Sequence, residues 1–486
     1  MGIVLKQSIN NTLITYIGFG IGAINHLFLF TRFMSDSNFG LVTVITSAAT
    51  VLMPILAFGV PNTLVKYFSN FKDSEHQNGF LTLMLLLPLA CIIPLWLLSY
   101  FAYDTIAGFL SVKNDMLRGY VWHIFLIALA MAYFEVFYAW AKVHMKSVFG
   151  NFMKEIFVRF GTTVLLVLIY LNVISVDLFL NALVGLYIVR MVVMKFSAYR
   201  LHMPKLDFNF PENTKTILSY SSFIILGASA AIVLLEIDKV MLNQFLEIKN
   251  VAYYGVATYI AMVIIVPSRS MHQITYPLTA TLMNNGDLGG LKRLYRKSSL
   301  TLFITSALLF LLIVCNVNAL YLLLPEAFRG GFTVVFIVGL IKVYDSLLGN
   351  VNSILYNSRY YRATLLMGVF LALLTVLFNL WLIPKFGIDG AAIASFLAFF
   401  VYNTIKLIFV KVKFKMQPFT TDTFKVFMLS LSVGLVFYFL NFNLYPIIDI
   451  LVKGSLITIC YVGVLYRFRI SEDVFKVLSR FLTKKR

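Results

Sequence analysis

Long apolar runs without charged residues dominate the pattern along the chain. Three of them, Gly79–Phe101, Ser299–Leu324 and Ala363–Pro384, contain no Asp, Glu, Lys or Arg. About 20 predominantly apolar residues suffice for a helix to cross the hydrocarbon core of a bilayer. Because lipid offers no hydrogen-bond partner to an exposed backbone, each run is expected to form a spanning helix.

The same pattern predicts fourteen spanning helices, and therefore an all-α integral membrane fold. We place them at 12–31, 40–60, 79–101, 119–140, 155–172, 178–197, 216–236, 251–270, 299–323, 332–354, 363–383, 388–410, 424–440 and 446–466. We expect the first helix to stay in the protein, because its apolar run is longer than that of a secretory signal peptide and no A-x-A-like cleavage site follows.

Composition excludes the main soluble classes. Of 486 residues, 60% are hydrophobic and 13% are charged, whereas a soluble domain has about 45–50% apolar and about 25% charged residues. A soluble enzyme, a disordered chain and a secreted disulfide scaffold are therefore excluded. The three cysteines, Cys91, Cys315 and Cys460, each lie inside an apolar run, which indicates packing rather than disulfide bonding.

The basic residues predict the orientation. Most of the 40 Lys and Arg residues fall in alternate loops and in both tails, and an excess of basic residues marks cytoplasmic segments. Both termini are therefore expected in the cytoplasm. The net charge of +19 then points to the membrane surface and not to nucleic acid. The tail 470–486 is predicted to be a basic amphipathic helix on anionic phospholipid.

Weak internal similarity suggests two related halves. Residues 170–189 align with 382–401 at an offset of 212, which places Asp177 on Asp389. We therefore predict a six-helix lobe at 1–205, a second six-helix lobe at 206–415, and a last part at 416–486 with helices 13 and 14 and the basic tail. Transporters commonly carry substrate between such halves.

Motifs for common enzyme chemistry are missing from the sequence. It contains no G-x-x-x-x-G-K-[ST] phosphate loop, no H-E-x-x-H pair or other metal-ligand spacing, and no G-x-S-x-G elbow. The longest predicted outer loops, 102–118 and 237–250, are too short to hold a catalytic domain. We therefore expect a transport protein without enzyme activity, a resident cofactor or a metal ion.

Charged residues inside the predicted spans mark candidate functional positions, because a charge at the bilayer centre costs about 2.5–3.5 kcal/mol on insertion scales. Lys342 and Asp345 share one helix face: the pair either contacts a substrate or neutralises itself between helices. Arg190 either binds an anionic group or extends to the inner headgroups. Glu135 either takes up a coupling proton or pairs at the interface, for example with Lys142.

A second group of polar residues lies toward the outer side or inside the first span. Each residue is either a functional group of the passage or an interfacial anchor or helix-packing residue. The group consists of Arg32, Glu236, Asp238, Lys239, Asn25 and His26.

Several motifs resemble one family. The stretch 379–394, with Asn379, Pro384, Gly387, Gly390, Ala391 and Ala392, resembles the N-x-x-L-I-P-x-x-G-I-x-G-A-A-x-A stretch of polysaccharide-export flippases. The segments 237–242, 252–257, 276–277 and 39–40 are similar to further parts of that family. The chain thus resembles the lipid-linked oligosaccharide (O-antigen, capsule) flippases of the multidrug/oligosaccharidyl-lipid/polysaccharide (MOP) superfamily. Small residues let helices approach closely, and Pro384 and Gly387 are expected to form a tight turn.

The resemblance implies two pseudo-symmetric, MATE-like lobes around a cavity, with two further helices that often form a groove for a lipid tail. The implied substrate is a polyprenyl-pyrophosphate-linked oligosaccharide that is moved outward across a bacterial inner membrane for surface polysaccharide synthesis. The expected substrate-binding cations of the cavity are Lys342, Arg190, Arg32 and Lys239, and the first three are the expected pyrophosphate contacts. Coupling to H⁺ or Na⁺ is assigned to Asp345 and Glu135, with Asp238 and Glu236 as further acids. A polysaccharide polymerase and glycosyltransferases are the expected protein partners.

Two alternatives stay open at this stage. A cation-coupled exporter of small molecules has the same fold, and buried acids without matching bases would favour it. A membrane polysaccharide polymerase or ligase is the second alternative, and a large ordered outer domain would favour it.

Overall fold

The computed structural model of the protein describes residues 2–71 and 76–471 and contains helices without any strand in those ranges. The predicted all-α fold is therefore confirmed. The chain divides into two compact units, residues 1–255 with 365–391, and residues 256–364 with 392–486.

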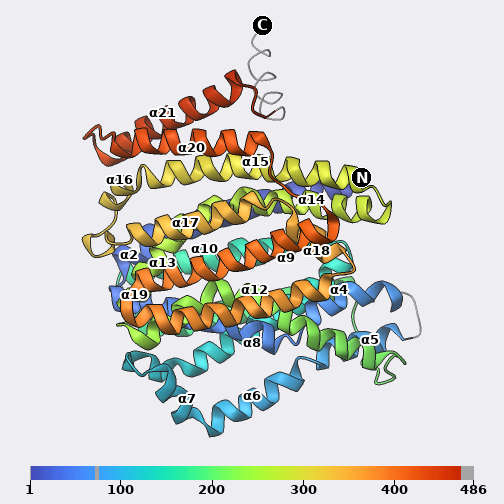
Figure 1. Ribbon diagram of the computed structural model, residues 1–486. Helices are drawn as coiled ribbons and strands as arrows, with labels where there is room; N and C mark the ends of the chain where they lie inside the picture. The colour runs from blue at the N-terminus through green and yellow to red at the C-terminus, as the bar shows by residue number, and fades with distance from the viewer. Residues whose placement is uncertain (1, 72–75, 472–486) are drawn as a thin grey trace. The chain divides into compact units, whose positions relative to one another are not determined.

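The first unit holds the helices of the N-terminal half (Figure 1). They are α1 (Gly2–Ile24), the π-helix η1 (Asn25–Leu29), α2 (Phe30–Phe33), α3 (Asp36–Leu56), α4 (Val60–Phe71), α5 (Gln77–Leu86), α6 (Leu89–Phe101), α7 (Tyr103–Leu110), the 3₁₀-helix η2 (Asp115–Tyr120), α8 (Val121–Val143), α9 (Ser147–Phe152), the π-helix η3 (Met153–Phe157), α10 (Val158–Tyr170), α11 (Val176–Leu201), α12 (Thr214–Phe245) and the start of α13 (Lys249–Met262). Helix α8 lies at the centre of this unit, where it packs on α11, α3 and α4.

The core of the first unit follows from the sequence of α8. Its apolar residues lie all around the helix, which is typical of a buried helix. Phe134 and Trp140 are fully buried, and Phe80 of α5 and Met194 of α11 pack into the same cluster. This core surrounds the polar residues described below.

The second unit holds the remaining helices. They are the end of α13, η4 (Val263–Ile265), α14 (Val266–Asn284), α15 (Leu288–Val314), α16 (Val317–Leu322), η5 (Glu326–Phe328), α17 (Phe332–Leu347), α18 (Val351–Asn357), the later part of α19 (Tyr361–Phe414), α20 (Thr421–Phe439) and α21 (Pro446–Arg467). Helices α15, α20 and α21 lie side by side (Figure 1).

The predicted turn at Pro384 and Gly387 is confirmed. A straight helix of 54 residues would extend for about 80 Å, far more than the bilayer core. Gly387 breaks α19 with a φ of 60° and a ψ of −133°. A Cβ on Gly390 would lie 2.2 Å from the carbonyl oxygen of Leu382, so the chain folds back tightly here. Ala391 and Ala392 are fully buried next to this turn.

Each of the fourteen predicted spans coincides with helical residues, but the number fourteen is not confirmed. Within the described ranges, ten helices are long and apolar enough to cross a membrane, or up to eleven when the bent pair Phe332–Leu347 and Val351–Asn357 is one span. The long α19 contains two predicted spans, while α10 has only 13 residues. The chain is therefore a multi-pass membrane protein, and the count remains a prediction.

The compact units do not follow the predicted lobe boundary at residue 206. Helix α12 belongs to the first unit because it packs along α3. Asp207, next to this boundary, contacts α5, where its amide donates to the Thr82 hydroxyl at 3.1 Å. The pseudo-symmetric lobes 1–205 and 206–415 and the part 416–486 stay a prediction. The predicted amphipathic tail lies, from residue 472 on, outside the described residues.

Candidate functional site

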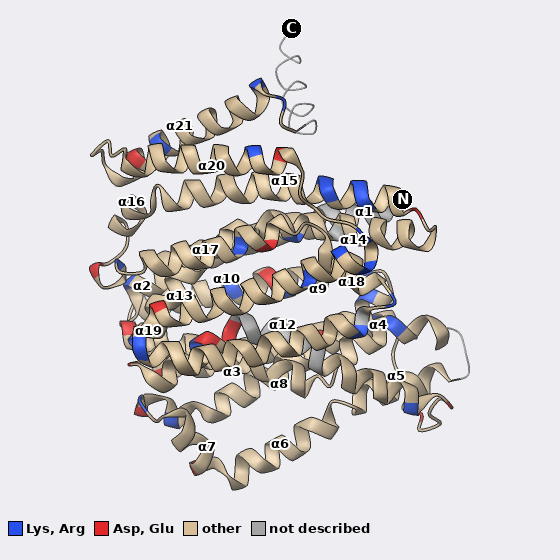
Figure 2. Cartoon of the chain, in the orientation of Figure 1, with Lys and Arg blue, Asp and Glu red and all other residues tan. Residues whose placement is uncertain are grey.

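Buried charge in this protein is mostly basic. The described charged side chains that are less than 9% exposed are Arg190 (5%), Asp238 (5%), Lys342 (5%), Lys406 (1%) and Lys453 (2%). Figure 2 shows that α17 carries both a basic and an acidic position along its length. The described residues thus include four buried bases and one buried acid. This excess of positive charge favours a site for an anion.

Arg190 on α11 lies among aromatic rings. Its Cζ is 4.2 Å from the ring centroid of Phe134 and 4.9 Å from that of Tyr187. Its Nε is buried and has no hydrogen-bond partner in the described structure. Glu135 and Glu155 are within electrostatic reach of its guanidinium. The alternative that Arg190 extends to the inner headgroups does not fit this burial, and a donor of the buried guanidinium remains available for an anion.

Glu135 forms an ion pair beside a small cavity. Its Oε1 accepts a hydrogen bond from Lys154 Nζ at 2.6 Å. Lys142, the partner suggested by the sequence, instead places its Nζ 3.8 Å from the ring centroid of Tyr138. All three charged residues line a cavity of about 200 Å³ in the first unit, together with Asn62. This cavity presents two ammonium groups and one carboxylate.

Asn25 and His26 lie in the π-helix η1 and serve different purposes. Asn25 Nδ2 donates to the carbonyl oxygen of Arg159 at 2.8 Å, and its Oδ1 accepts from Thr163 at 2.7 Å. Asn25 therefore joins two helices, in agreement with the packing alternative. His26 Nδ1 lies 3.0 Å from the carbonyl oxygen of Gly22 in its own helix. Wide helical turns of this kind are frequent at functional sites.

The acids at the end of α12 face different neighbours. Glu236 Oε2 accepts from Lys239 Nζ at 2.7 Å and from the Ser47 hydroxyl at 2.6 Å. Asp238 accepts from Asn379 Nδ2 at 2.7 Å and from the Tyr254 hydroxyl at 2.8 Å. Sequence reasoning treated Asn379 as a motif residue and missed its bond to Asp238.

Arg32, one of the predicted substrate-binding cations, is exposed. It ends α2 with its Cζ 6.0 Å from the ring centroid of Phe28. The structure does not bring it into the buried set around Arg190.

In the second unit, Lys342 and Asp345 are on α17 as predicted. Lys342 is buried, with its Nζ 5.5 Å from the ring centroid of Phe399. Asp345 Oδ1 accepts from Asn403 Nδ2 at 3.4 Å. His272 and Lys406 are within electrostatic reach of Asp345. Basic and acidic groups from α14, α17 and α19 thus share one region of this unit.

Among the described residues, Lys406 is one of two buried cations, with Lys453, that the sequence did not indicate. Its Nζ donates to Asn352 Oδ1 at 3.1 Å and lies 4.2 Å from the ring centroid of Tyr402. The residue falls inside the predicted span 388–410, only four positions from its inner end. Basic residues at such ends usually reach the headgroups, so its position in the sequence does not mark it as buried.

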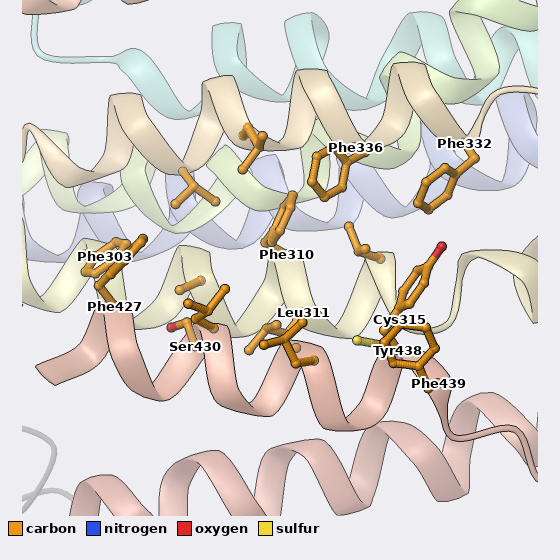
Figure 3. A pocket seen from close by; sticks show the side chains of 17 residues that line it. Phe303, Phe310, Leu311, Cys315, Phe332, Phe336, Phe427, Ser430, Tyr438 and Phe439 are labelled. Carbon is orange, nitrogen blue, oxygen red and sulfur yellow. The ribbon is translucent and has the colours of Figure 1, made fainter. Parts of the chain in front are cut away.

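An apolar groove also lies in the second unit. It has a volume of about 570 Å³ and is lined by residues of α15, α17 and α20. Figure 3 shows Phe310, Phe332, Phe336, Phe427 and Tyr438 around it. Ser430 is one of its few polar lining residues, so the groove suits a hydrocarbon chain.

Within the described ranges, no three His, Cys, Asp or Glu side chains are close enough to hold a metal ion together. The side chains described above are cations, carboxylates, amides and aromatic rings. Such groups bind anions and sugars, since ammonium and guanidinium groups form charge-assisted hydrogen bonds to phosphate.

Comparisons with known proteins bear on the family and the fold. A family model described as polysaccharide biosynthesis protein matches residues 4–283, and a comparison with curated proteins finds no significant match. The structure is similar to that of the lipid II flippase MurJ in an inward closed conformation, with a TM-score of 0.73 and 13% identity over 95% of this chain and 100% of that one.

Two further solved structures have the same fold. One is an inward-facing multidrug resistance MATE family transporter of the MOP superfamily, with a TM-score of 0.64 and 13% identity over 84% of this chain and 98% of that one. The other is a MOP superfamily transporter from Pyrococcus furiosus, with a TM-score of 0.56 and 13% identity over 85% and 94%. The fold is that of the MOP superfamily transporters.

Proposed function

The chain belongs to the family of polysaccharide biosynthesis proteins, and from this premise we propose that it is a flippase. Its substrate is a polyprenyl-pyrophosphate-linked oligosaccharide, which it moves from the inner to the outer leaflet by alternating access. The product serves the synthesis of a surface polysaccharide. The shared fold of MurJ and the MATE transporters supports this proposal.

Buried Arg190 is the observation that carries the proposal. A pyrophosphate and its sugars cannot cross hydrocarbon without polar partners, because an unpartnered polar group loses its hydration there. The planar guanidinium donates several hydrogen bonds in a geometry that matches phosphate. Arg190 has an unpartnered Nε, and the acids near it form ion pairs of their own. Lys342 and Lys406 supply further positive charge in the second unit.

The apolar groove supports a lipid substrate. A polyprenyl chain needs a hydrocarbon-like path while its head group passes through the protein. The groove between α15, α17 and α20 has a lining of that character. The polyprenyl tail lies in this groove or in the surrounding bilayer during transport.

Coupling to H⁺ or Na⁺ belongs to the same proposal. In the second unit we assign the coupling role to Asp345, since its partner Asn403 is an amide and the cation Lys406 is within electrostatic reach. Glu135 is the acid of choice in the first unit, where it pairs with Lys154. Either carboxylate can exchange its partner for an ion when the substrate leaves.

The orientation follows from the basic residues. Both termini lie in the cytoplasm and the protein resides in a bacterial inner membrane, where a polysaccharide polymerase and glycosyltransferases are its partners. The chain itself catalyses no covalent step. A polymerase or ligase is disfavoured because the predicted outer loop 102–118 is largely taken up by the short helices α7 and η2.

A multidrug-type exporter is the second candidate, because the MATE transporters have the same fold. Exporters of organic cations need buried acids without matching bases. The described part of this chain buries four bases and one acid, Asp238, and Asp238 is bonded to Asn379 and Tyr254. The sign of the buried charge therefore favours an anionic substrate.

Leaflet-specific detection of the lipid-linked repeat unit tests the proposal. Deleting the protein should leave the repeat units on the cytoplasmic leaflet. Arg190→Ala and Lys342→Ala should impair export at normal expression, whereas Lys195→Ala, an exposed lysine on the same helix as Arg190, should not. Normal export by both variants would contradict the role of the buried cations.

A further inference from the structure

Asn114, in the loop before η2, is bonded to the turn between α12 and α13. Its Nδ2 donates to the carbonyl oxygens of Asn243 and Leu246, both at 2.9 Å, and its Oδ1 accepts from the amide of Ile248 at 2.8 Å. Asn243 returns a hydrogen bond to the carbonyl oxygen of Leu110 at 2.9 Å. One buried amide thus holds backbone groups that the end of α12 leaves without helical partners.

The same turn touches the backbone of α3. A Cβ on Gly40 would lie 2.1 Å from the carbonyl oxygen of Ile248, so the two backbones meet at a glycine. One turn earlier, Asp36 accepts a hydrogen bond from the Tyr253 hydroxyl at 2.7 Å. No side chain larger than hydrogen fits at position 40 unless the two segments separate.

Contacts continue along α3 and α12 in an antiparallel order. Ser47 of α3 donates to Glu236 of α12, which also holds Lys239. The eleven residues from Asp36 to Ser47 rise about 16 Å along the helix. We call this set of contacts the outer clasp: Asp36 with Tyr253, Gly40 with Ile248, Ser47 with Glu236, and Asn114 with residues 243–248.

The position of the clasp in the chain points to its purpose. The sequence repeat assigns α3 to the first half and α12 to the second, although both belong to one compact unit here. The basic residues place residues 36, 114 and 248 on the outer side. We propose that the outer clasp is the outer gate of the transport path: it is closed in this structure, and it must break each time substrate leaves.

The hydrogen bonds of Asn114 hold this gate closed, and the missing side chain of Gly40 allows it to close. The inference rests on the proposed function for its meaning in transport, but the closed state can be measured without any substrate. Loss of Asn114 leaves carbonyl and amide groups of residues 243–248 unpartnered, so water competes for them and the gate opens more often. A methyl group at position 40 keeps α3 and the turn apart.

Labelling of a reporter cysteine from outside the cell tests the gate. The background replaces Cys91, Cys315 and Cys460 by alanine, and Thr43→Cys places the reporter on α3 between Gly40 and Ser47, where the native side chain is buried. A membrane-impermeant maleimide should label this cysteine slowly. Asn114→Ala and Gly40→Ala should each raise the labelling rate at least threefold.

Asn181→Ala is the matched control, because Asn181 is an exposed asparagine on the predicted outer side that bonds to its own helix and to His123. It should leave the labelling rate unchanged. Equal labelling of the parent, Asn114→Ala and Gly40→Ala proteins would overturn the gate. If size-exclusion chromatography shows that Asn114→Ala is not folded, Asn114→Asp replaces it. Aspartate keeps the size and one acceptor of the side chain.

Crosslinking gives a second, independent measurement. A short bis-maleimide across Asp36→Cys and Tyr253→Cys should stop translocation, while each single cysteine with the same reagent should not. Continued translocation by the crosslinked protein would overturn the gate. If labelling responds as expected but no variant moves a lipid-linked oligosaccharide, the gate stands and the proposed function fails.

Discussion

Two groups of basic residues, one in each compact unit, are held in different ways. In the first unit, Lys154, Arg159 and Lys239 each contact a carboxylate, with nitrogen to oxygen distances of 2.6, 2.6 and 2.7 Å. In the second unit, Lys406 is bonded to the amide of Asn352 and lies over an aromatic ring. A carboxylate neutralises its cation, whereas an amide leaves the positive charge available.

The difference suggests a division of labour in binding an anion. A head group that enters the first unit must compete with Glu135 for Lys154, so binding and release there are reversible and depend on the acid. A head group near Lys406 would meet a positive charge for which no hydrogen-bonded carboxylate competes. Lys406 in the second unit and Arg190 in the first unit are thus expected to supply affinity, whereas the Glu135–Lys154 pair is expected to supply exchange.

The largest expected effect is that of Lys406→Met. Methionine keeps much of the shape but removes the charge. We expect export to fall at least about tenfold, since a charge-assisted hydrogen bond is worth about 1.5–3 kcal/mol and about 1.4 kcal/mol is a factor of ten. The melting temperature in detergent should change little, because burying a charged ammonium is itself costly. Export rate and melting temperature are the two measurements.

Lys411→Met, at an exposed position of the same helix, is the control for that substitution. Normal export by Lys406→Met would contradict the role of Lys406 in substrate binding, and with it the difference that we infer between the two units. A collapse in melting temperature together with export would assign Lys406 to folding instead.

Asn352→Asp should have a smaller effect, because it converts the second unit to the pattern of the first. The new carboxylate would pair with Lys406 and compete with an anionic substrate, so we expect apparent affinity to fall about fivefold, the equivalent of a charge pair worth about 1 kcal/mol. Substrate titration in nanodiscs measures this shift. Asn357→Asp on the same helix should leave the affinity unchanged, and an unaltered affinity for Asn352→Asp would contradict the competition.

Glu135→Gln should have the smallest effect on binding of the anionic head group, and the effect should have the opposite sign. It releases Lys154 from its pair, whose side chains are 17% exposed for Glu135 and 43% exposed for Lys154. Pairs of such exposure are worth about 0.2–1 kcal/mol, so an anionic head group should bind about twofold more tightly and leave more slowly. Binding and single-turnover release are the measurements.

Glu247→Gln removes an equally short but exposed pair with Lys249 and should change neither binding nor release. Weaker binding by Glu135→Gln would show that the carboxylate holds the cation in place and does not compete for it.

Local properties of the sequence were enough to predict the helices, the membrane environment and the turn in α19. Apolar runs without charge have one stable arrangement in lipid, and that arrangement is a helix whatever its neighbours are. Gly387 was predictable as a turn because glycine readily adopts a positive φ. Lys342 could be predicted as an intramembrane charge because it stands near the middle of its run.

Only the tertiary structure decided which charges are buried and what they contact. Glu135 pairs with Lys154 and not with Lys142, Asp238 is bonded to Asn379 at a separation of 141 residues, and Arg32 is exposed. Hydropathy depends on composition within one segment, whereas a partner depends on which distant segments the packing brings together. For the same reason, residue 206 could be read as a repeat boundary although α12 packs along α3 in one compact unit.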